Sequence, residues 1–567
     1  MKRLSIVPPF LFALFPILSL YASNVRLVRP RELVVPSVAA IAVSALLLLV
    51  TYILLRDLDG AAIVVCAVWV LVILYRVALK ALGGAGQGRE YLLLVASLAL
   101  FSGVALAVRR WRGQLRELVQ VVAVMGIALV AMPIAKAAPA LISQRPQPIA
   151  RTQNAVLGGA EVQLPTVTPP EVEPKAAHPT ALPTEPATGS TEALMLAAAP
   201  AASEETPAPT ASPSPTASLT GANKPDIYYI ILDGYARQDV LQEIYGYDNT
   251  AFLQALEDRG FYVATRSRAN YCQTYLSLAS SLNGTYLDAL AAGSLAEGDD
   301  RRPLQDMIRQ NAAASYLRDQ GYTYVAYSTG YTDAEMQSAD VYVAAPKSLS
   351  QFTSGLMNTT PISPVIALQY DLHRQRLLYA FDHLPDAATR DGPTFVFAHI
   401  CAPHPPFVFA EDGTPVTPNR EFTLSDGSHY MSGPDRAETA EYVERYRGQV
   451  AFVSQRILQT VDAILAASPT PPIIILQADH GPGAYLYWET PQKTNMKERL
   501  SILNAYYVPP EIRAQLYEEI TPVNTFRILF NALFGTDYIL APDASYFSTW
   551  NHPYRFIPVS PEGTPQP

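Results

Sequence analysis

The sequence predicts a protein in three parts: a bundle of about five transmembrane helices, a disordered linker, and an α/β domain built as an α/β/α sandwich. Of the 567 residues, 49% are hydrophobic and only 16% are charged, which is typical of a chain with a membrane-embedded portion. Residues 139–223 contain no Phe, Trp or Tyr and many prolines. From residue 224 onward, strand patterns alternate with helical patterns.

The first 138 residues are predicted to form the transmembrane helical domain. A helix needs roughly 20 residues to cross a bilayer, and apolar stretches near this length occupy residues 4–22, 34–55, 61–79, 91–108 and 118–137. The first stretch follows Met-Lys-Arg and therefore also resembles a signal peptide. A retained helix is favoured, because further apolar stretches follow and no small-residue cleavage site does.

Basic residues between the spans predict the orientation of the chain. The loop 109–116, RRWRGQLR, carries four arginines and is predicted to be cytoplasmic, since Lys and Arg concentrate in cytoplasmic loops. Lys2 and Arg3 agree with this orientation, whereas the arginines at 26, 29 and 31 oppose it. With five spans and a cytoplasmic N-terminus, we expect a multi-pass protein of the cell membrane whose C-terminal domain is extracytoplasmic.

Residues 139–223 are predicted to be a disordered Pro/Ser/Thr-rich linker. Stretches such as TPAPTASPSPTAS combine proline with small and polar residues. Without aromatic side chains, such a segment cannot bury enough apolar surface to offset its chain entropy. Proline stiffens the segment, so it would hold the following domain away from the membrane.

Residues 224–567 are predicted to form one catalytic α/β domain. Buried strands are expected in PDIYYIILDG, PTFVFAHI and PPIIILQADHG, and a long amphipathic helix is expected at 437–467. The segments TAFLQALEDRGFYVATRS and SYLRDQGYTYVAYST each predict a helix, a glycine stop and a strand. Strands that alternate with helices predict a mostly parallel sheet covered on both faces.

Charge and cysteine content exclude several classes of protein. The net charge is −9 and no basic aromatic patch is present, so we expect no nucleic-acid partner. The three cysteines, Cys66, Cys272 and Cys401, form no C-x-x-C pair, so neither a structural zinc site nor a disulfide scaffold is indicated. The sequence leaves open whether Cys272 and Cys401 pair.

Two predicted strands end in acids, and doubly wound sheets bind ligands beyond the carboxyl ends of their strands. Asp233 ends the first strand, while Asp479 and His480 end the last, and a glycine follows closely in both cases. Taken alone, an Asp-His pair is usually a turn cap beside a surface histidine. If the two strands are close, however, these side chains form a shell for one divalent cation, Mn²⁺, Zn²⁺ or Mg²⁺.

The stretch SRANYCQTYLSLASS contains three candidate nucleophiles, Cys272, Thr274 and Ser277. Apolar periodicity from Tyr275 predicts a helix that begins there, which places Thr274 at or beside the N-cap. Capping alone accounts for a threonine at this position. The same geometry also favours an anionic phosphoryl group beside the hydroxyl, because helix N-terminal amides and the helix dipole attract anions.

The stretch FAHICAPHPPFVF contributes two candidate substrate-binding histidines. His399 is expected near the end of a strand, and His404 in a loop that Pro405 and Pro406 make rigid. A histidine in a loop is usually just polar surface. One held between prolines just past a strand is a better candidate for a positioned acid or a phosphate ligand.

The order of these motifs resembles the alkaline phosphatase and sulfatase superfamily. A strand that ends in Asp233, Thr274 at a helix start, then PHPP, then a strand that ends in DHG follow one another within roughly residues 224–540. The layout of five spans before an external catalytic domain resembles lipoteichoic acid synthases and phosphoethanolamine transferases. The resemblance implies a sulfatase-like α/β/α sandwich that binds one divalent cation.

The resemblance also implies a role for each site residue. Asp233, Thr274, Asp479 and His480 would bind the cation. Thr274 would in addition be the nucleophile and form a covalent phosphothreonine. His404 would contact the substrate phosphate or protonate the leaving group.

The chain departs from the superfamily's patterns in three respects. Transferases of this kind usually carry a glutamate at the first metal position, where this chain has Asp233. Ordinary sulfatases carry C/S-x-P-x-R, whereas Cys272 is followed by QTYL. Periplasmic phosphoethanolamine transferases carry several disulfides, for which this domain lacks cysteines. These departures count against an ordinary sulfatase and leave the subfamily open.

Three functions are compatible with the sequence. The first is a membrane-anchored phosphotransferase or phosphodiesterase that acts on a phosphoester, such as a phospholipid headgroup, for envelope polymer or glycan modification. Its partners would be the lipid bilayer and a membrane phospholipid or envelope glycan substrate. The second is a hydrolase of sulfuric or phosphoric esters that uses water as acceptor. The third is a non-catalytic envelope scaffold, against which the complete set of metal and nucleophile residues argues.

Overall fold

The computed structural model describes most of the chain outside the linker. The described residues are 4–25, 28–82, 87–111, 114–142, 224–291, 297–347, 349–359, 363–418, 420–431 and 436–565. The predicted linker, residues 139–223, lies outside the described residues except at its start. There the last N-terminal helix continues to Ile142, past the boundary predicted at residue 138.

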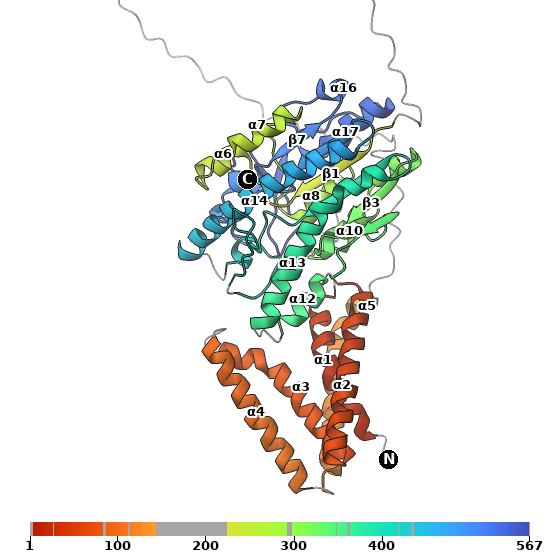
Figure 1. Ribbon diagram of the computed structural model, residues 1–567, viewed down its shortest axis with the longest axis vertical. Coiled ribbons are helices and arrows are strands. Elements are labelled where there is room, and N and C mark those ends of the chain that lie inside the picture. Colours follow the sequence, from red (N-terminus) through yellow and green to blue (C-terminus); the bar gives the residue numbers. More distant parts are fainter. Residues whose placement is uncertain are drawn as a thin grey trace, which may run out of the picture. The chain divides into compact units, whose positions relative to one another are not determined.

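Five apolar helices occupy the N-terminal region, as the sequence predicts (Figure 1). They are α1 (Val7–Ser23), α2 (Val34–Leu55), α3 (Leu58–Ala81), α4 (Gln87–Arg110) and α5 (Arg116–Ile142). By length and composition, α2 to α5 can each cross a membrane. At 17 residues α1 is shorter, although a 3-10 turn at Leu4–Ile6 directly precedes it.

Side-chain exposure on these helices fits a lipid environment. Val35, Leu54 and Leu106 are 75%, 74% and 68% exposed, and they belong to broad apolar faces of α2 and α4. Hydrocarbon accommodates such faces, which soluble proteins rarely expose to water. Between helices the packing is close, because a Cβ on Gly126 of α5 would lie 3.2 Å from the Cβ of Leu11 in α1.

A seven-stranded sheet forms the centre of the α/β domain, with strand order β2-β7-β6-β1-β5-β3-β4. The strands are β1 (Ile227–Leu232), β2 (Tyr262–Val263), β3 (Thr323–Tyr327), β4 (Val341–Val343), β5 (Thr394–Ile400), β6 (Ile473–Gln477) and β7 (Asn504–Tyr507). β7 is antiparallel to both of its neighbours, β2 and β6, and the other four strand pairs are parallel. The sheet is therefore mostly parallel, as predicted.

Helices cover both faces of the sheet. Successive side chains of a buried strand point to opposite faces, so each face needs a layer of helices against it. Tyr229 of β1 packs edge-on against Phe526 of α17 (Pro522–Phe534), with ring centroids 5.2 Å apart. On the other face, the Tyr327 hydroxyl of β3 donates to the carbonyl of His383 in α13 (Ser363–His383). The predicted α/β/α sandwich is confirmed.

The long helix predicted at 437–467 is α14 (Arg436–Ala467), and it packs beside α13. Its length and composition also satisfy the criteria for a membrane span. However, Val450, Ile457 and Ile464 are fully buried in the core of the α/β domain. On its other side Glu441 and Arg445 form an ion pair at 2.9 Å. This helix is therefore an amphipathic cover of the sheet.

The remaining elements complete the layers and the loops around them. They are α6 (Gln238–Glu243), α7 (Thr250–Asp258), α8 (Thr274–Ser281), α9 (Asp288–Ala291), α10 (Arg302–Arg309), α11 (Ala312–Asp319), α12 (Gln351–Met357), α15 (Met496–Leu500), α16 (Pro510–Arg513), β8 (Ser545–Phe547) and β9 (Ile557–Val559). α8 packs against α10 and α17. β8 and β9 form a separate two-stranded antiparallel sheet.

The strand order positions the site. β1 lies between β5 and β6, with which it runs parallel. The carboxyl ends of these three strands therefore meet at one edge of the sheet. Each is followed by a residue with a titratable side chain: Asp233 after β1, Cys401 after β5, and Asp479 two residues after β6.

Candidate active site

Asp233, Asp479 and His480 converge at the carboxyl ends of β1 and β6. In the register of the sheet, Ile231 lies opposite Gln477. The two acids follow two positions later and so lie at the same level. His480 Nε2 is 3.3 Å from Asp479 Oδ2 and 3.6 Å from Asp233 Oδ1, and all three side chains are buried. The structure brings this cluster together, while its role in metal binding remains a prediction.

Glycines make the turns after these strands possible. Gly234 has a φ of +75°, a left-handed conformation that favours glycine. A Cβ on Gly481 would collide with the carbonyl oxygen of Glu498. A Cβ on Gly483 would lie 2.8 Å from the carboxylate of Asp426. The Gly-Pro-Gly that follows the Asp-His pair therefore allows two other segments to approach the site closely.

Thr274 is the first residue of α8, directly after the N-cap residue Gln273. Its Oγ1 lies 3.0 Å from His480 Nε2. Burial, followed by the charge of Arg499, lowers the pKa of His480 to about 3, so the imidazole is neutral. With its Nδ1 3.0 Å from the carbonyl of Gly481, the ring donates from Nδ1. Nε2 then carries a lone pair aimed at Thr274 and Asp233, as a metal ligand requires.

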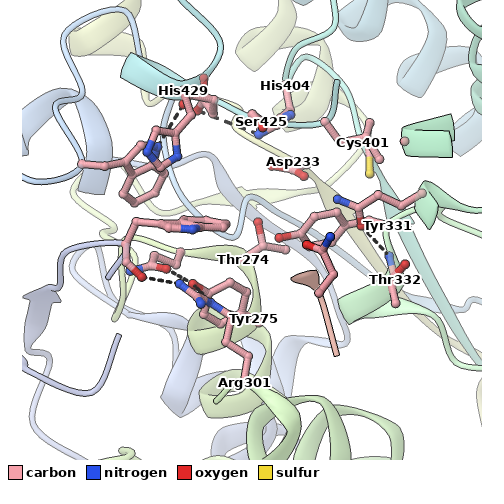
Figure 2. Close-up of a pocket in the computed structure, with 18 of the residues that line it drawn as sticks. Asp233, Thr274, Tyr275, Arg301, Tyr331, Thr332, Cys401, His404, Ser425 and His429 are labelled. Carbon is pink, nitrogen blue, oxygen red and sulfur yellow. Dashed lines mark hydrogen bonds and ion pairs between the residues drawn. The ribbon is translucent and has the colours of Figure 1, made fainter. Parts of the chain in front are cut away.

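The other two candidate nucleophiles have structural partners. The hydroxyl of Ser277 donates to the carbonyl of Asp479 at 2.7 Å. The Cys272 thiol lies 3.3 Å from the backbone nitrogen of Ser548 and 3.5 Å from its carbonyl oxygen. Cys272 and Cys401 are both free and buried, which answers the question of their pairing in this structure. Of the three candidates, only Thr274 lines the pocket (Figure 2).

The electrostatics of the cluster favour a bound cation. Burial, followed by the charge of Asp233, raises the pKa of Asp479 to about 7. Burial opposes ionisation of Asp233 too, but His404, His399 and His480 together outweigh it and hold its pKa well below the usual range. The pKa of His399 is raised, because the neighbouring Cys401 and Asp233 outweigh the effect of burial. Two ionised carboxylates this close repel each other, and a bound cation would offset that repulsion.

Unpartnered polar atoms show that the residues fit a divalent cation. Asp233 Oδ1 and Asp479 Oδ2 are buried and accept no hydrogen bond within the described residues. The other oxygen of Asp479 accepts from the backbone amides of Gly234 and His480. A carboxylate oriented in this way presents one free oxygen to the cluster. Donor atoms of Asp233, His404 and His480 lie within 4.8 Å of one another, close enough for one ion.

The two histidines of the β5 region take different positions. His404 lines the pocket, and its Nε2 lies 3.9 Å from Asp426 Oδ2 (Figure 2). His399 has a fully buried side chain, with Nε2 3.2 Å from Asp233 Oδ2. His404 is therefore placed as a substrate contact would be. For His399 the expected contact with substrate is disfavoured, because the ring lies against the carboxylates and away from the pocket.

A buried ion pair that the sequence analysis did not single out holds the loops of the site together. Arg499 Nη1 lies 2.6 Å from Asp426 Oδ2, with side chains 1% and 3% exposed. The same guanidinium donates to the carbonyls of Cys272 and Gly481, each at 2.8 Å. Arg499 thus connects the segments that carry the nucleophile candidate and the Asp-His pair. No local pattern in the sequence marks either residue.

The sequence patterns also gave no indication of a wall of aromatic and cationic side chains beside Thr274. The guanidinium of Arg301 lies 4.4 Å from the ring centroid of Trp550 and 4.9 Å from that of Tyr275. His429 packs edge-on against Trp550, with centroids 5.5 Å apart. All four residues line the pocket, and Figure 2 labels three of them, Tyr275, Arg301 and His429. Trp550 follows β8, beyond the part of the chain that carries the sequence motifs.

A comparison with protein families identifies the class of protein. The Sulfatase family profile matches residues 225–529, which is more than half of the chain. The chain therefore belongs to the Sulfatase family, and with it to the alkaline phosphatase and sulfatase superfamily. The matched residues include Asp233, Asp479 and His480. No curated protein matches the chain.

Solved structures with a similar fold include transferases and putative sulfatases. The zinc complex of the periplasmic domain of EptC from Escherichia coli is 12% identical, with 59% of this chain and 93% of that chain covered, at a TM-score of 0.39. The integral membrane lipooligosaccharide phosphoethanolamine transferase EptA from Neisseria meningitidis is 13% identical, with 56% of both chains covered and a TM-score of 0.36. A putative sulfatase from Bacteroides thetaiotaomicron is 14% identical, with 57% and 73% covered and a TM-score of 0.35. These values are too low to carry information about substrate or mechanism.

Proposed function

We propose that the protein is a membrane-anchored, metal-dependent phosphotransferase or phosphodiesterase whose nucleophile is Thr274. The observation that carries the proposal is the position of the Thr274 hydroxyl. It lies 3.0 Å from His480 Nε2, at the N-terminus of α8, beside two buried carboxylates with unpartnered oxygens. Asp233, Thr274, Asp479 and His480 would hold one divalent cation, Mn²⁺, Zn²⁺ or Mg²⁺. When bound, the cation would acidify the threonine hydroxyl and offset charge on the phosphoryl group.

The first chemical step would transfer a phosphoryl-linked group to the enzyme. The Thr274 oxygen, which has released its proton to solvent beforehand, forms a bond to phosphorus while the bond to the leaving alcohol breaks. The amides of the first turn of α8 favour the negative charge of the phosphoryl oxygens. His404, on the pocket wall, donates a proton to the departing oxygen.

The second step would return the enzyme to its starting state. An acceptor hydroxyl attacks the phosphothreonine, and His404 takes the proton of that hydroxyl as the bond to Thr274 breaks. Such covalent two-step chemistry gives ping-pong kinetics. If the acceptor is water the same residues catalyse hydrolysis, so the acceptor alone separates a transferase from a phosphodiesterase.

A formylglycine-dependent sulfatase is disfavoured within the same family. In such an enzyme a cysteine or serine in a C/S-x-P-x-R sequence would supply the nucleophile. Here Cys272 is turned toward Ser548 and is followed by Gln-Thr-Tyr-Leu. Thr274 instead occupies the position beside His480.

The substrate class follows from the setting of the site. We propose a phosphoester in a membrane, such as a phospholipid headgroup, with a second headgroup or an envelope glycan as acceptor. The five apolar helices would keep the enzyme at the bilayer. The wall formed by Tyr275, His429 and Trp550 offers aromatic faces for a headgroup or sugar next to the nucleophile.

The proposed layout has a transmembrane domain at 1–138, a linker at 139–223 and an extracytoplasmic catalytic domain at 224–567. The four arginines at 109–116 support this orientation, because Lys and Arg concentrate in cytoplasmic loops. A reporter enzyme fused at residue 220 should be active only outside the cytoplasm. Activity of the fusion in the cytoplasm would contradict the proposed topology.

Mass spectrometry of the full chain tests the nucleophile. After incubation of the detergent-solubilised protein with phospholipid vesicles and a divalent cation, we expect a phosphoryl-linked adduct on the peptide that contains Thr274. Thr274→Ala should lose the adduct and turnover yet stay folded, since its hydroxyl contacts His480 and loss of one such hydrogen bond costs about 1 kcal/mol. Cys272→Ser is the matched control and should retain the adduct. An adduct that persists in Thr274→Ala, or maps to Cys272 or Ser277, contradicts the proposal.

A further inference from the structure

The carboxylate of Asp233 has one oxygen on each side of β1. Oδ1 lies 3.6 Å from His480 Nε2, on the side of the proposed nucleophile. Oδ2 lies 3.2 Å from His399 Nε2, on the side of β5. The proposed function uses only the first side, and it leaves the side chains around Oδ2 without a role.

His399 and Cys401 are two positions apart at the end of β5, so their side chains point to the same face. His399 Nδ1 lies 3.8 Å from the thiol sulfur of Cys401. Asp233 lies level with Cys401, because Leu232 is opposite Ile400 in the sheet. Asp233, His399 and Cys401 can each place one donor atom within 4.8 Å of the other two.

These side chains are buried and incompletely partnered. Asp233, His399 and Cys401 are 3%, 2% and 2% exposed. Asp479 Oδ2 has no hydrogen-bond partner within the described residues. His399 Nε2, 3.9 Å from it, also makes no hydrogen bond there and has only the ion pair with Asp233 Oδ2 at 3.2 Å. A buried polar atom without a partner costs roughly 1–3 kcal/mol. A cation held between these atoms would remove that cost.

We propose that Asp233, His399 and Cys401 form a second metal site, which shares the Asp233 carboxylate with the cation of the proposed active site. This inference rests on the proposed function, since Asp233 would give one oxygen to each ion. Ions about 3.5–4 Å apart are usual in two-metal phosphoryl-transfer sites.

The ligand chemistry identifies the kind of ion. Thiolate, imidazole and carboxylate together suit Zn²⁺, whereas Mg²⁺ and Mn²⁺ prefer oxygen ligands. Binding would release the thiol proton of Cys401 and any proton on His399 to solvent. Cys401 also lines the pocket, which gives the ion a path of entry (Figure 2).

The surrounding charges allow this ion. The buried guanidinium of Arg376 acts electrostatically on Cys401 and opposes a cation. Arg499 also acts on Asp479, although its own charge is paired with Asp426. Against these positive charges stand the Cys401 thiolate and the carboxylates of Asp233 and Asp479. An ion at this site would also separate the two carboxylates electrostatically and orient Asp233 toward the nucleophile.

The chain contains a matched control for the test. Cys272 is likewise a free, buried cysteine near the site, but its thiol faces Ser548. The detergent-solubilised full chain would be loaded with Zn²⁺, dialysed and analysed by inductively coupled plasma mass spectrometry. We expect two zinc ions per chain in the unsubstituted protein and in Cys272→Ser, but one in Cys401→Ser. Circular dichroism would verify that each variant is folded.

Cobalt substitution gives a second readout, which reports directly on thiolate ligation. Co²⁺ bound by a thiolate produces a near-ultraviolet charge-transfer band, which we expect in the unsubstituted protein and in Cys272→Ser but not in Cys401→Ser. Absence of the band from the unsubstituted protein, or its persistence in Cys401→Ser, overturns the second site. One ion per chain that His480→Ala removes and Cys401→Ser retains overturns only this inference. Absence of any bound ion overturns the proposed function as well.

Discussion

The two sides of the proposed active site are built in different ways. We call them the strand-end side (Asp233, Asp479 and His480) and the loop side (His404, Asp426 and Arg499). The strand-end residues follow β1 and β6, whose pairing places them at one level of the sheet. The loop-side residues come from three separate segments, and a buried ion pair at 2.6 Å joins two of them.

The two sides differ in what holds their side chains in place. The strand-end side is held by backbone hydrogen bonds of a buried sheet, so its geometry depends little on any one side chain. The loop side depends on Arg499, which contacts the segments of Asp426, Cys272 and Gly481. We therefore expect strand-end variants to fail in metal binding and chemistry, and loop-side variants to fail in proton transfer or in packing.

The largest effect is expected on the strand-end side. Asp233→Ala, Asp479→Ala and His480→Ala should each lower bound metal, because each removes a proposed direct ligand. Turnover should fall by more than the roughly 10–100-fold that loss of an outer partner of a metal site costs. Metal analysis together with phosphodiesterase assays would measure both. The surface variant Glu441→Ala is the control and should keep its metal. Full metal occupancy in all three strand-end variants would show that these residues are not the metal ligands.

The next effect separates the two roles of His404. If His404 protonates the leaving group, His404→Ala should slow cleavage of a natural ester by roughly 10²–10⁴-fold. A p-nitrophenyl phosphodiester should be affected far less, because its leaving group needs no proton. Steady-state kinetics on both substrates would decide. An equal loss on both would instead make His404 a phosphate-binding residue.

Removal of Arg499 should act on stability. Arg499→Ala leaves Asp426 as an uncompensated buried charge, which typically costs about 3–5 kcal/mol of unfolding free energy. The matched control is Arg266→Ala. The Arg266 side chain is 62% exposed and pairs with Glu518, at 2.9 Å, and with Glu519. The unfolding free energy of that variant should fall by no more than about 1 kcal/mol. Thermal unfolding of the detergent-solubilised proteins would compare them, and equal losses would show that the ion pair does not hold the loop side.

The last effect concerns the pH dependence of stability through Glu498, the residue before Arg499 of the loop side. Burial raises the pKa of Glu498, next to Arg499, from 4.5 to about 8, although hydrogen bonds from Tyr245 and the Tyr485 amide partly oppose it. Between these values the folded state retains a proton that the unfolded state releases, so stability falls as pH rises from about 5 to about 8. Glu498→Gln should reduce this fall. Unfolding midpoints at pH 5 and pH 8 that change equally in both proteins would contradict the shift.

Much of the architecture could be predicted from local patterns. The five apolar stretches became α1 to α5, and the helix at 437–467 became α14, because apolar length and helical periodicity are local properties of the chain. The strand that ends in Asp233 and the strand before Asp479 were both recognisable as continuous apolar runs followed by glycine. The family resemblance added the expectation that these two ends meet.

The sequence by itself determined the membrane portion, the alternation of strands and helices, and the residue types available for metal and phosphoryl chemistry. Tertiary structure decided that β1 lies between β5 and β6, which buried His399 against the carboxylates and set Cys401 beside it. It also decided that Arg499 pairs with Asp426 and that Trp550 reaches the pocket. These contacts join segments far apart in the chain. Their formation depends on strand order and on packing between layers, for which a single sequence carries no local pattern.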